Sequence, residues 1–206
     1  MTNPQVDLMT VVRGHWRDDI AAAVAETVVP PSFLAALIAN ESDGNAEAVR
    51  FEPAVFSELA EVILGKRKAY SPAGIQHALV RAELLNYVEP VGPGMSGMSD
   101  FSDCLGRLSE LATSRGLTQI MGWHFVEMAR PMPGPALLPT DYLQFTVELL
   151  AYFASRYLLD QSKNFPELFR SWNTGKPDGQ TFDPHYVSNG LSRMEIYAQL
   201  EQGTAL

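Results

Sequence analysis

The sequence has little of what several protein classes require. Its 206 residues include one cysteine, Cys104, so no disulfide can form within the chain. Lys and Arg total 15 against 24 Asp and Glu, which gives a formal net charge of −9. There is no basic patch that would neutralise a phosphate backbone, and we therefore expect no nucleic-acid partner.

Long hydrophobic runs are also absent. No stretch reaches the roughly 20 apolar residues that cross a bilayer, so we expect no integral membrane segment. Residues 1–10 lack the basic segment, apolar core and small-residue cleavage site of a secretory signal. If the substrate lies outside the cytoplasm, we expect a partner to deliver the protein.

Histidines are few and scattered, at positions 15, 77, 124 and 185. His124 and Glu127 have helical spacing, but no second histidine is near them, which argues against a zinc site. We expect His124 to pack beside Trp123 and Phe125. The sequence calls for no metal and no cofactor.

Apolar residues make up 46% of the chain and recur mostly at helical spacing. This pattern predicts a mainly α fold, and the length suits one compact domain over residues 1–206. Glu89–Ser99 is rich in helix breakers and predicts an exposed loop, although residues 92–97 match G-x-G-x-x-G. Pro131–Pro135 is a second Pro-rich stretch.

The helices are expected where apolar stripes run between breakers and caps. Pro30 and Pro31 should end a first helix, and Asp141 with Gln144 is a candidate capping box for a long buried one. The expected helices are about Trp16–Val28, one starting near Ser32, Ala54–Gly65, Pro72–Tyr87, Ser99–Ser114, Leu143–Leu158, Phe165–Trp172 and Val187–Ala198.

Glu41 is the candidate catalytic acid. It continues an apolar stripe formed by Phe33, Leu34, Leu37 and Ile38, and the turn sequence Asp-Gly-Asn follows at residues 43–45. Breaking a glycosidic bond requires an acid that stays neutral near the working pH, and burial in apolar surroundings raises the pKa of a carboxyl group. The pattern therefore favours Glu41 for this chemistry.

Three separated segments resemble lysozyme-like lytic transglycosylases and phage-type N-acetylmuramidases, in the family's order. Ala36–Ser42 resembles the helix that ends in the family's Glu-Ser pair. Ser114–Gly122 is similar to the segment Ser-x-Gly-Leu-Met-Gln-Ile, with Thr in place of Met. Trp172–Gly175 resembles Tyr-Asn-Ala-Gly, with Trp in place of Tyr, and a helix bearing Tyr186 and Tyr197 follows.

The resemblance implies a lysozyme-like α+β domain with a substrate groove. It implies that Glu41 is the acid and that Ser42 orients the acid or the glycan. The residues implied to contact substrate are Gly116, Leu117, Gln119, Ile120, Trp172, Asn173 and Tyr197. Residues 1–30 would be an N-terminal helical extension and residues 60–113 an insertion. A short hairpin or irregular segment is expected near Ala46–Glu52.

Arg50–Phe56 is similar to the Phe-Glu-x-x-x-Phe pattern of the phage-type muramidases, although a surface or ion-paired Glu52 is the favoured interpretation. Two mechanisms remain open. A lytic transglycosylase needs only Glu41, whereas an inverting hydrolase needs a second carboxylate about 6.5–9.5 Å away, for which Asp43, Glu47 and Glu52 are candidates.

The implied activity is cleavage of the β-1,4 bond between N-acetylmuramic acid and N-acetylglucosamine in peptidoglycan strands. Two alternatives stay open. One is a non-catalytic glycan-binding or structural protein of a phage or secretion apparatus that keeps the fold. The other is a chitinase-like glycosidase.

Overall fold

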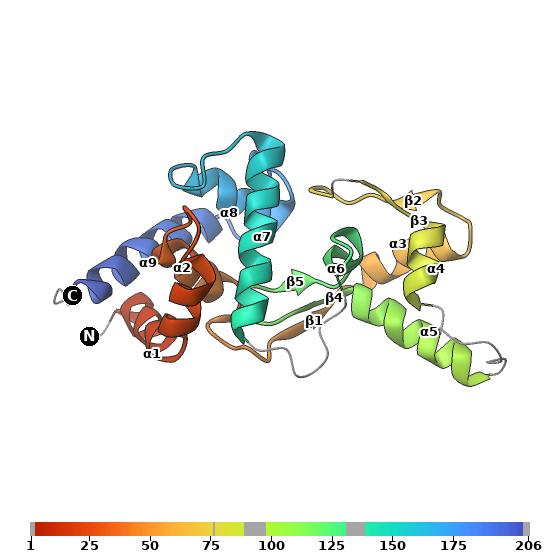
Figure 1. Ribbon diagram of the computed structural model, residues 1–206, viewed down its shortest axis with the longest axis horizontal. Coiled ribbons are helices and arrows are strands. Elements are labelled where there is room, and N and C mark those ends of the chain that lie inside the picture. The colour runs from red at the N-terminus through yellow and green to blue at the C-terminus, as the bar shows by residue number, and fades with distance from the viewer. Residues whose placement is uncertain (1–2, 76, 89–97, 131–138, 204–206) are drawn as a thin grey trace. The chain divides into compact units, whose positions relative to one another are not determined.

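The computed structural model describes residues 3–75, 77–88, 98–130 and 139–203 (Figure 1). It is mainly helical, with 63% of the described residues in helices, which confirms the expected α class. The described residues form nine helices and five short strands. None of these helices is long and apolar enough to cross a membrane.

The chain divides into two compact units. Unit 1 comprises Met1–Ala48, Gly116–Gln119 and Pro135–Leu206, and unit 2 comprises Val49–Arg115 and Ile120–Gly134. The chain thus crosses between them four times. One domain over residues 1–206, with an extension at 1–30 and an insertion at 60–113, stays a prediction, because units connected by repeated crossings can belong to one domain.

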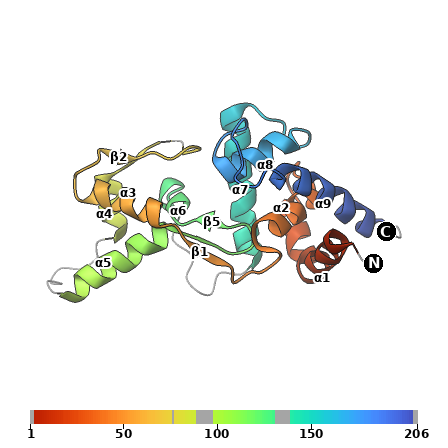
Figure 2. The same ribbon diagram turned by 180° about the vertical axis from the view of Figure 1, so that it is seen from behind.

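The regular secondary structure in the described part of unit 1 is all helical. Its helices are α1 (Pro4–Val24), α2 (Pro31–Ser42), α7 (Pro139–Tyr157), α8 (Phe165–Thr174) and α9 (Tyr186–Glu201). Helices α1 and α9 pack on α2, and α7 packs on α1 and α8 (Figures 1 and 2).

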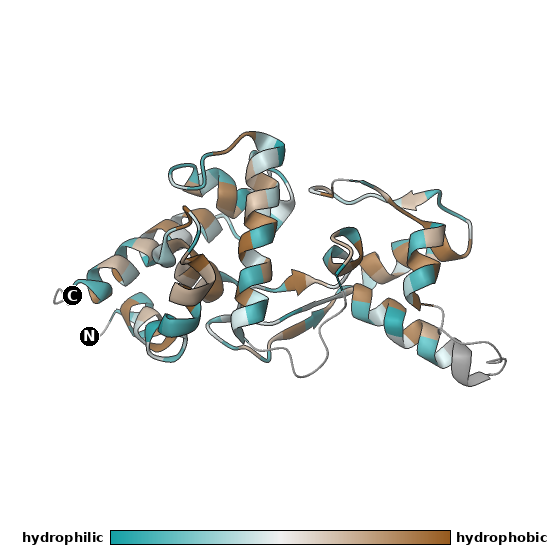
Figure 3. Ribbon diagram, viewed as in Figure 1, coloured by the Kyte–Doolittle hydropathy of each residue, from teal (hydrophilic) through white to brown (hydrophobic). Residues whose placement is uncertain are grey.

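Helix α2 forms the centre of this unit. All seven residues from Phe33 to Ala39 are fully buried, so the helix is enclosed on every side and not along one stripe only. Figure 3 accordingly colours most of it on the hydrophobic side of the scale. A helix that is apolar all round belongs in a core. Its expected start near Ser32 is confirmed.

The first helix differs from its expected range of Trp16–Val28. It begins at Pro4, because the Asn3 side chain accepts a hydrogen bond from the backbone N–H of Gln5 (3.0 Å) and a proline follows at the first helical position. It ends at Val24, before the two prolines.

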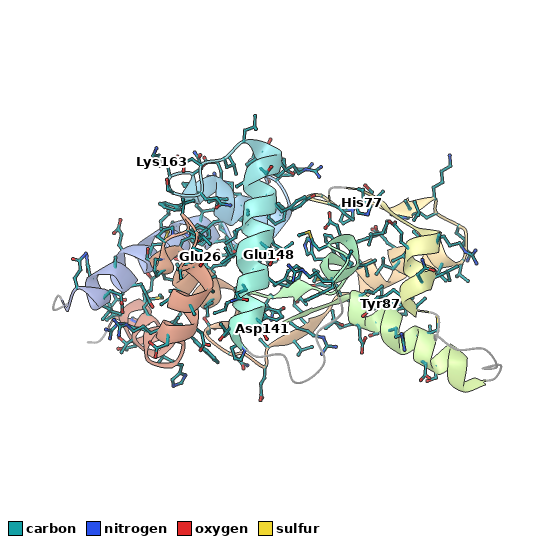
Figure 4. The ribbon with its side chains drawn as sticks, viewed as in Figure 1. Glu26, His77, Tyr87, Asp141, Glu148 and Lys163 are labelled. Carbon is teal, nitrogen blue, oxygen red and sulfur yellow. The ribbon has the colours of Figure 1, made fainter. Side chains whose placement is uncertain are left out.

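The three later helices of unit 1 match the expected ones. Helix α7 covers the expected long buried segment. It begins at Pro139, so Asp141 is an exposed residue of its first turn and not the cap that was expected (Figure 4). Helix α8 carries Leu168 and Trp172, and α9 covers the last apolar stripe.

Unit 2 combines short helices with two small sheets around its own apolar cluster. Its elements are β1 (Val49–Phe51), α3 (Pro53–Ile63), β2 (Ala69–Tyr70), β3 (Leu79–Val80), α4 (Arg81–Val88), α5 (Met98–Leu111), β4 (Thr113–Arg115), β5 (Ile120–Met121) and α6 (Trp123–Glu127). The first sheet has the order β1-β4-β5 with antiparallel pairs, and Ser114 lies opposite both Arg50 and Met121.

Several expectations for unit 2 need correction. The helix expected over Pro72–Tyr87 is only α4, since Tyr70 and Leu79 pair across an antiparallel ribbon before it. The helix expected over Ser99–Ser114 ends at Leu111, because residues 113–115 pair with β1. The helix expected over Ala54–Gly65 is confirmed as α3.

The segment Ala46–Glu52 contains a strand, β1, whose partner β4 is distant in sequence, so no local hairpin forms there. The loop expected at Glu89–Ser99 and the Pro-rich stretch at Pro131–Pro135 fall largely or wholly outside the described residues.

Candidate active site

Glu41 lies at the end of α2, directly after the buried apolar stretch, and its side chain is half-buried. The helix stops as expected, because Asp43 and Gly44 adopt left-handed conformations with φ of 52° and 84°. The indole Nε1 of Trp16 donates to the carbonyl of Gly44 at 2.9 Å and fixes this end to α1. Glu41 therefore stands on a rigid core helix.

Tyr186, the first residue of α9, donates a hydrogen bond from its hydroxyl to Oε1 of Glu41. The tyrosine is only 7% exposed, and its ring packs edge-on against Phe169 of α8 at 6.2 Å between centroids. Burial, the charge of Glu41 and the hydrogen bond to it raise the pKa of Tyr186 well above its ordinary value. The hydroxyl therefore stays a neutral donor across the pH range of most enzymes.

Ser42 connects α2 to the turn between β4 and β5. Its Oγ lies 2.8 Å from the carbonyl oxygen of Leu117 and 3.2 Å from that of Ile38. The shorter contact spans 75 residues of sequence, and it brings the second motif of the sequence next to the first. The role of Ser42 here is to hold this turn.

The turn itself is held by Gln119 and Gly116. Both have positive φ, 53° and 72°, and the side-chain Nε2 of Gln119 donates to the carbonyls of Ala48 (3.0 Å) and Gly116 (2.9 Å). A Cβ at Gly116 would lie 2.8 Å from the ring of Tyr142. Backbone conformation and packing thus explain why a glycine occupies position 116. The side-chain amide of Gln119 supports the turn.

The other residues expected to bind substrate occupy different environments. Trp172 is half-buried and donates from Nε1 to the carbonyl of Thr118 at 3.0 Å, which anchors the same turn from α8, whereas Asn173 is exposed. Leu117, Ile120 and Tyr197 are buried, at 1%, 2% and 1% exposure. Tyr197 belongs to the core of unit 1, so the tyrosine that the structure brings to Glu41 is Tyr186.

The three candidates for a second catalytic carboxylate differ in their environments. Asp43 and Glu47 are exposed near the end of α2. Glu52 belongs to unit 2 and forms an ion pair with Arg50 at 2.5 Å, in line with the favoured interpretation.

His124 and Glu127 form a buried pair on α6 in unit 2, with Nδ1 and Oε2 3.0 Å apart. The imidazole packs against Trp123 at 3.7 Å between ring centroids, as expected, and burial lowers the pKa of His124. Within the described ranges, no group of three His, Cys, Asp or Glu side chains could hold a metal ion.

Two contributors to the site were not identified from the sequence. Asn40 donates from Nδ2 to the backbone carbonyl of Tyr186 at 2.9 Å, and Arg193 donates from Nη1 to Oδ1 of Asn40 at 2.7 Å. The only feature of the sequence that could have indicated Asn40 is its position directly before Glu41. Arg193 lies 153 residues from Asn40, and no local pattern relates them.

Comparison with known proteins identifies no relative: no family model, no curated protein and no solved structure matches the chain.

Proposed function

We propose that this protein cleaves the β-1,4 bond between N-acetylmuramic acid and N-acetylglucosamine in peptidoglycan, with Glu41 as the general acid. The observation that carries the proposal is the neutral, buried Tyr186 hydroxyl on the carboxyl group of Glu41, at the end of a fully buried helix. The resemblance of the three ordered motifs supplies the substrate class. The finer fold assignment, lysozyme-like, is part of the same proposal.

The chemistry begins with proton transfer. Tyr186 donates to Oε1 of Glu41, and in this proposal the protonated carboxyl group of Glu41 is the proton source. Glu41 gives this proton to the glycosidic oxygen while the bond to C1 of muramic acid breaks through an oxocarbenium-like transition state. The resulting carboxylate then accepts a proton from the nucleophile that attacks C1. If the nucleophile is the sugar's own C6 hydroxyl, the product is a 1,6-anhydro end, and if it is water, a reducing end.

Turn Gly116–Gln119 supports this assignment because three separate bonds fix it within unit 1. Ser42 contacts it from α2, Trp172 contacts it from α8, and Gln119 closes it internally. A substrate-lining loop needs such support, because reacting groups must be held within a fraction of an ångström of their productive positions. In this proposal the turn borders the glycan, and assisted delivery brings the protein to the cell wall.

The test is digestion of purified peptidoglycan by wild type, Glu41→Gln and the matched control Glu195→Gln, which removes an exposed carboxylate of α9. We expect soluble muropeptides from wild type and from the control, and a loss of at least about 10²-fold with Glu41→Gln. Mass spectrometry assigns anhydro ends to a transglycosylase and reducing ends to a hydrolase.

Two results would redirect the proposal. If wild type releases nothing at any pH or salt concentration but is retained on sacculi together with Glu41→Gln, the protein is a glycan-binding or structural protein. If it cleaves N-acetylglucosamine polymers and leaves peptidoglycan intact, it is a chitinase-like glycosidase.

A further inference from the structure

Two consecutive residues of α2 form hydrogen bonds with Tyr186, one with its side chain and one with its backbone. Its hydroxyl donates to Glu41, and its backbone carbonyl accepts the Nδ2 hydrogen bond of Asn40 at 2.9 Å. Two attachments to one helix fix both the position of the tyrosine and the direction of its ring. The contact between Tyr186 and Glu41 is therefore maintained by the backbone as well as by the side chains.

Arg193 fixes the orientation of Asn40. A guanidinium group only donates hydrogen bonds and a carbonyl only accepts them, so the amide oxygen of Asn40 must face Arg193 and its nitrogen must face Tyr186. In the opposite orientation both bonds would be lost. Tyr186 and Arg193 lie seven residues apart on α9, which places them on the same helix face.

The position of Arg193 costs folding stability, because a charged side chain is partly buried there. This cost favours a functional role for its contact with Asn40. Its Nε atom is buried, and among the described residues it has no hydrogen-bond partner. Burial lowers the pKa of Arg193, while the charges of Asp43 and Asp183 act in the opposite direction. A surface arginine would avoid the cost of an unpaired buried donor.

We propose that Asn40 and Arg193 are positioning residues that hold Tyr186 on Glu41 and thereby set the geometry of the acid. Neither residue is assigned a contact with substrate. The effect on turnover rests on the proposed glycosidase function, whereas the effect on Tyr186 does not. The experiment therefore needs one measurement without substrate and one with it.

The first measurement is ¹⁹F NMR of protein labelled with 3-fluorotyrosine, in which the fluorine next to the hydroxyl reports on the hydrogen bond. The Tyr186→Phe variant assigns the signal. We expect Arg193→Met and Asn40→Leu to shift or broaden the Tyr186 signal. The control Arg170→Met, the same substitution on α8, should leave it in place, because the guanidinium group of Arg170 faces Glu167 of its own helix at 3.9 Å.

The second measurement is turnover of peptidoglycan. Displacing the acid should lower kcat roughly 10–100-fold in Arg193→Met and Asn40→Leu, with KM within about twofold of wild type, because no binding contact is removed. Arg193→Lys restores a cationic donor near Asn40 and should recover part of kcat. Arg170→Met should keep full activity.

The outcomes separate the two proposals. An unchanged Tyr186 signal in both variants overturns the positioning role, and so does a shifted signal with unchanged kcat. A shifted signal in a protein whose wild type cleaves no glycan leaves the network in place but overturns the glycosidase function. If Arg193→Met does not fold, Asn40→Leu carries the test, since leucine has the same number of heavy side-chain atoms and the same branching as asparagine and adds no charge.

Discussion

Two polar clusters, one in each unit, are held in different ways. In unit 1, Asn40, Glu41 and Ser42 at the end of one helix bond to residues between 75 and 153 positions away. In unit 2, the buried polar pair His124 and Glu127 lies three residues apart on one short helix. A pair within one helical turn can form as soon as that turn forms. The contacts of the unit 1 network form only when the tertiary structure brings its helices together.

This difference explains why the candidate site belongs to unit 1. Distant elements can fix a carboxyl group from several directions at once, which is what proton transfer at a defined atom requires. A local pair satisfies its own hydrogen bonds and contributes to stability. Four predictions test whether the two units behave as differently as their polar groups suggest.

The largest effect is expected from the core of unit 1. Phe33 is fully buried, with its ring 4.5 Å from that of Phe169, so Phe33→Ala should lower the free energy of unfolding by about 3–5 kcal/mol. Because the chain crosses between the units four times, slow-exchanging amides of both units should lose protection together. Hydrogen exchange with mass spectrometry measures this. Protection that falls in unit 1 alone would show that the units unfold independently.

A smaller effect is expected from a tight backbone contact in unit 2. A Cβ at Gly122 would lie 2.1 Å from the carbonyl oxygen of Glu110, so Gly122→Ala should cost about 1–3 kcal/mol. The control Gly106→Ala, on α5 with open space around it, should instead stabilise the protein by about 0.5–1 kcal/mol. Urea denaturation compares the stabilities of the two variants. Equal changes in the free energy of unfolding would contradict the close contact between Gly122 and the carbonyl of Glu110.

The buried pair of unit 2 should make stability depend on pH. Burial lowers the pKa of His124 below its ordinary 6.5, so between the two values the unfolded chain binds more protons than the folded one. The free energy of unfolding should therefore fall as the pH drops through 6.5, by at most about 1.4 kcal/mol per pH unit, and level off below the folded pKa. Melting temperatures of wild type and His124→Gln between about pH 7.5 and 5.5 test this. Parallel slopes in the two proteins would refute the assignment.

The smallest effect concerns an exposed long-range contact in unit 1. Glu201 of α9 pairs with Arg13 at 2.5 Å and with Arg17 at 3.0 Å, both on α1. These side chains are partly exposed, so Glu201→Gln should cost only about 0.2–1 kcal/mol. Thermal unfolding at low and high salt measures this loss of stability. The difference between wild type and Glu201→Gln should shrink as the salt concentration increases. A larger, salt-independent loss would mean that this contact contributes as a buried one does.

The sequence predicted the parts of the site that depend on local pattern. The apolar run of α2, its termination at residues 43–44 and the motif at Gly116–Gln119 are all readable from adjacent residues. The contact of Ser42 with that turn joins the first two of these segments in space. Periodicity also identified the long helices of unit 1, because each buries an apolar face over several turns.

The remaining features depend on pairing between distant residues. Tyr197 was preferred to Tyr186, yet only the packing of α9 decides which tyrosine meets Glu41. Arg193 could not be recognised, because its partner Asn40 is 153 residues away. A strand of two residues shows no periodicity of its own, and β3 falls inside the helix expected over Pro72–Tyr87.

The separation of Glu41 and Tyr186 in the sequence has a consequence for biosynthesis. The tyrosine is added to the chain 145 residues after the glutamate. At about 5–20 residues per second, a ribosome needs roughly 7–30 s to reach it. During that interval the nascent polypeptide contains the carboxyl group of Glu41 but not the hydroxyl that donates to it. A translation product that stops before α9 would therefore lack the hydrogen bonds that Tyr186 and Arg193 form with Asn40 and Glu41.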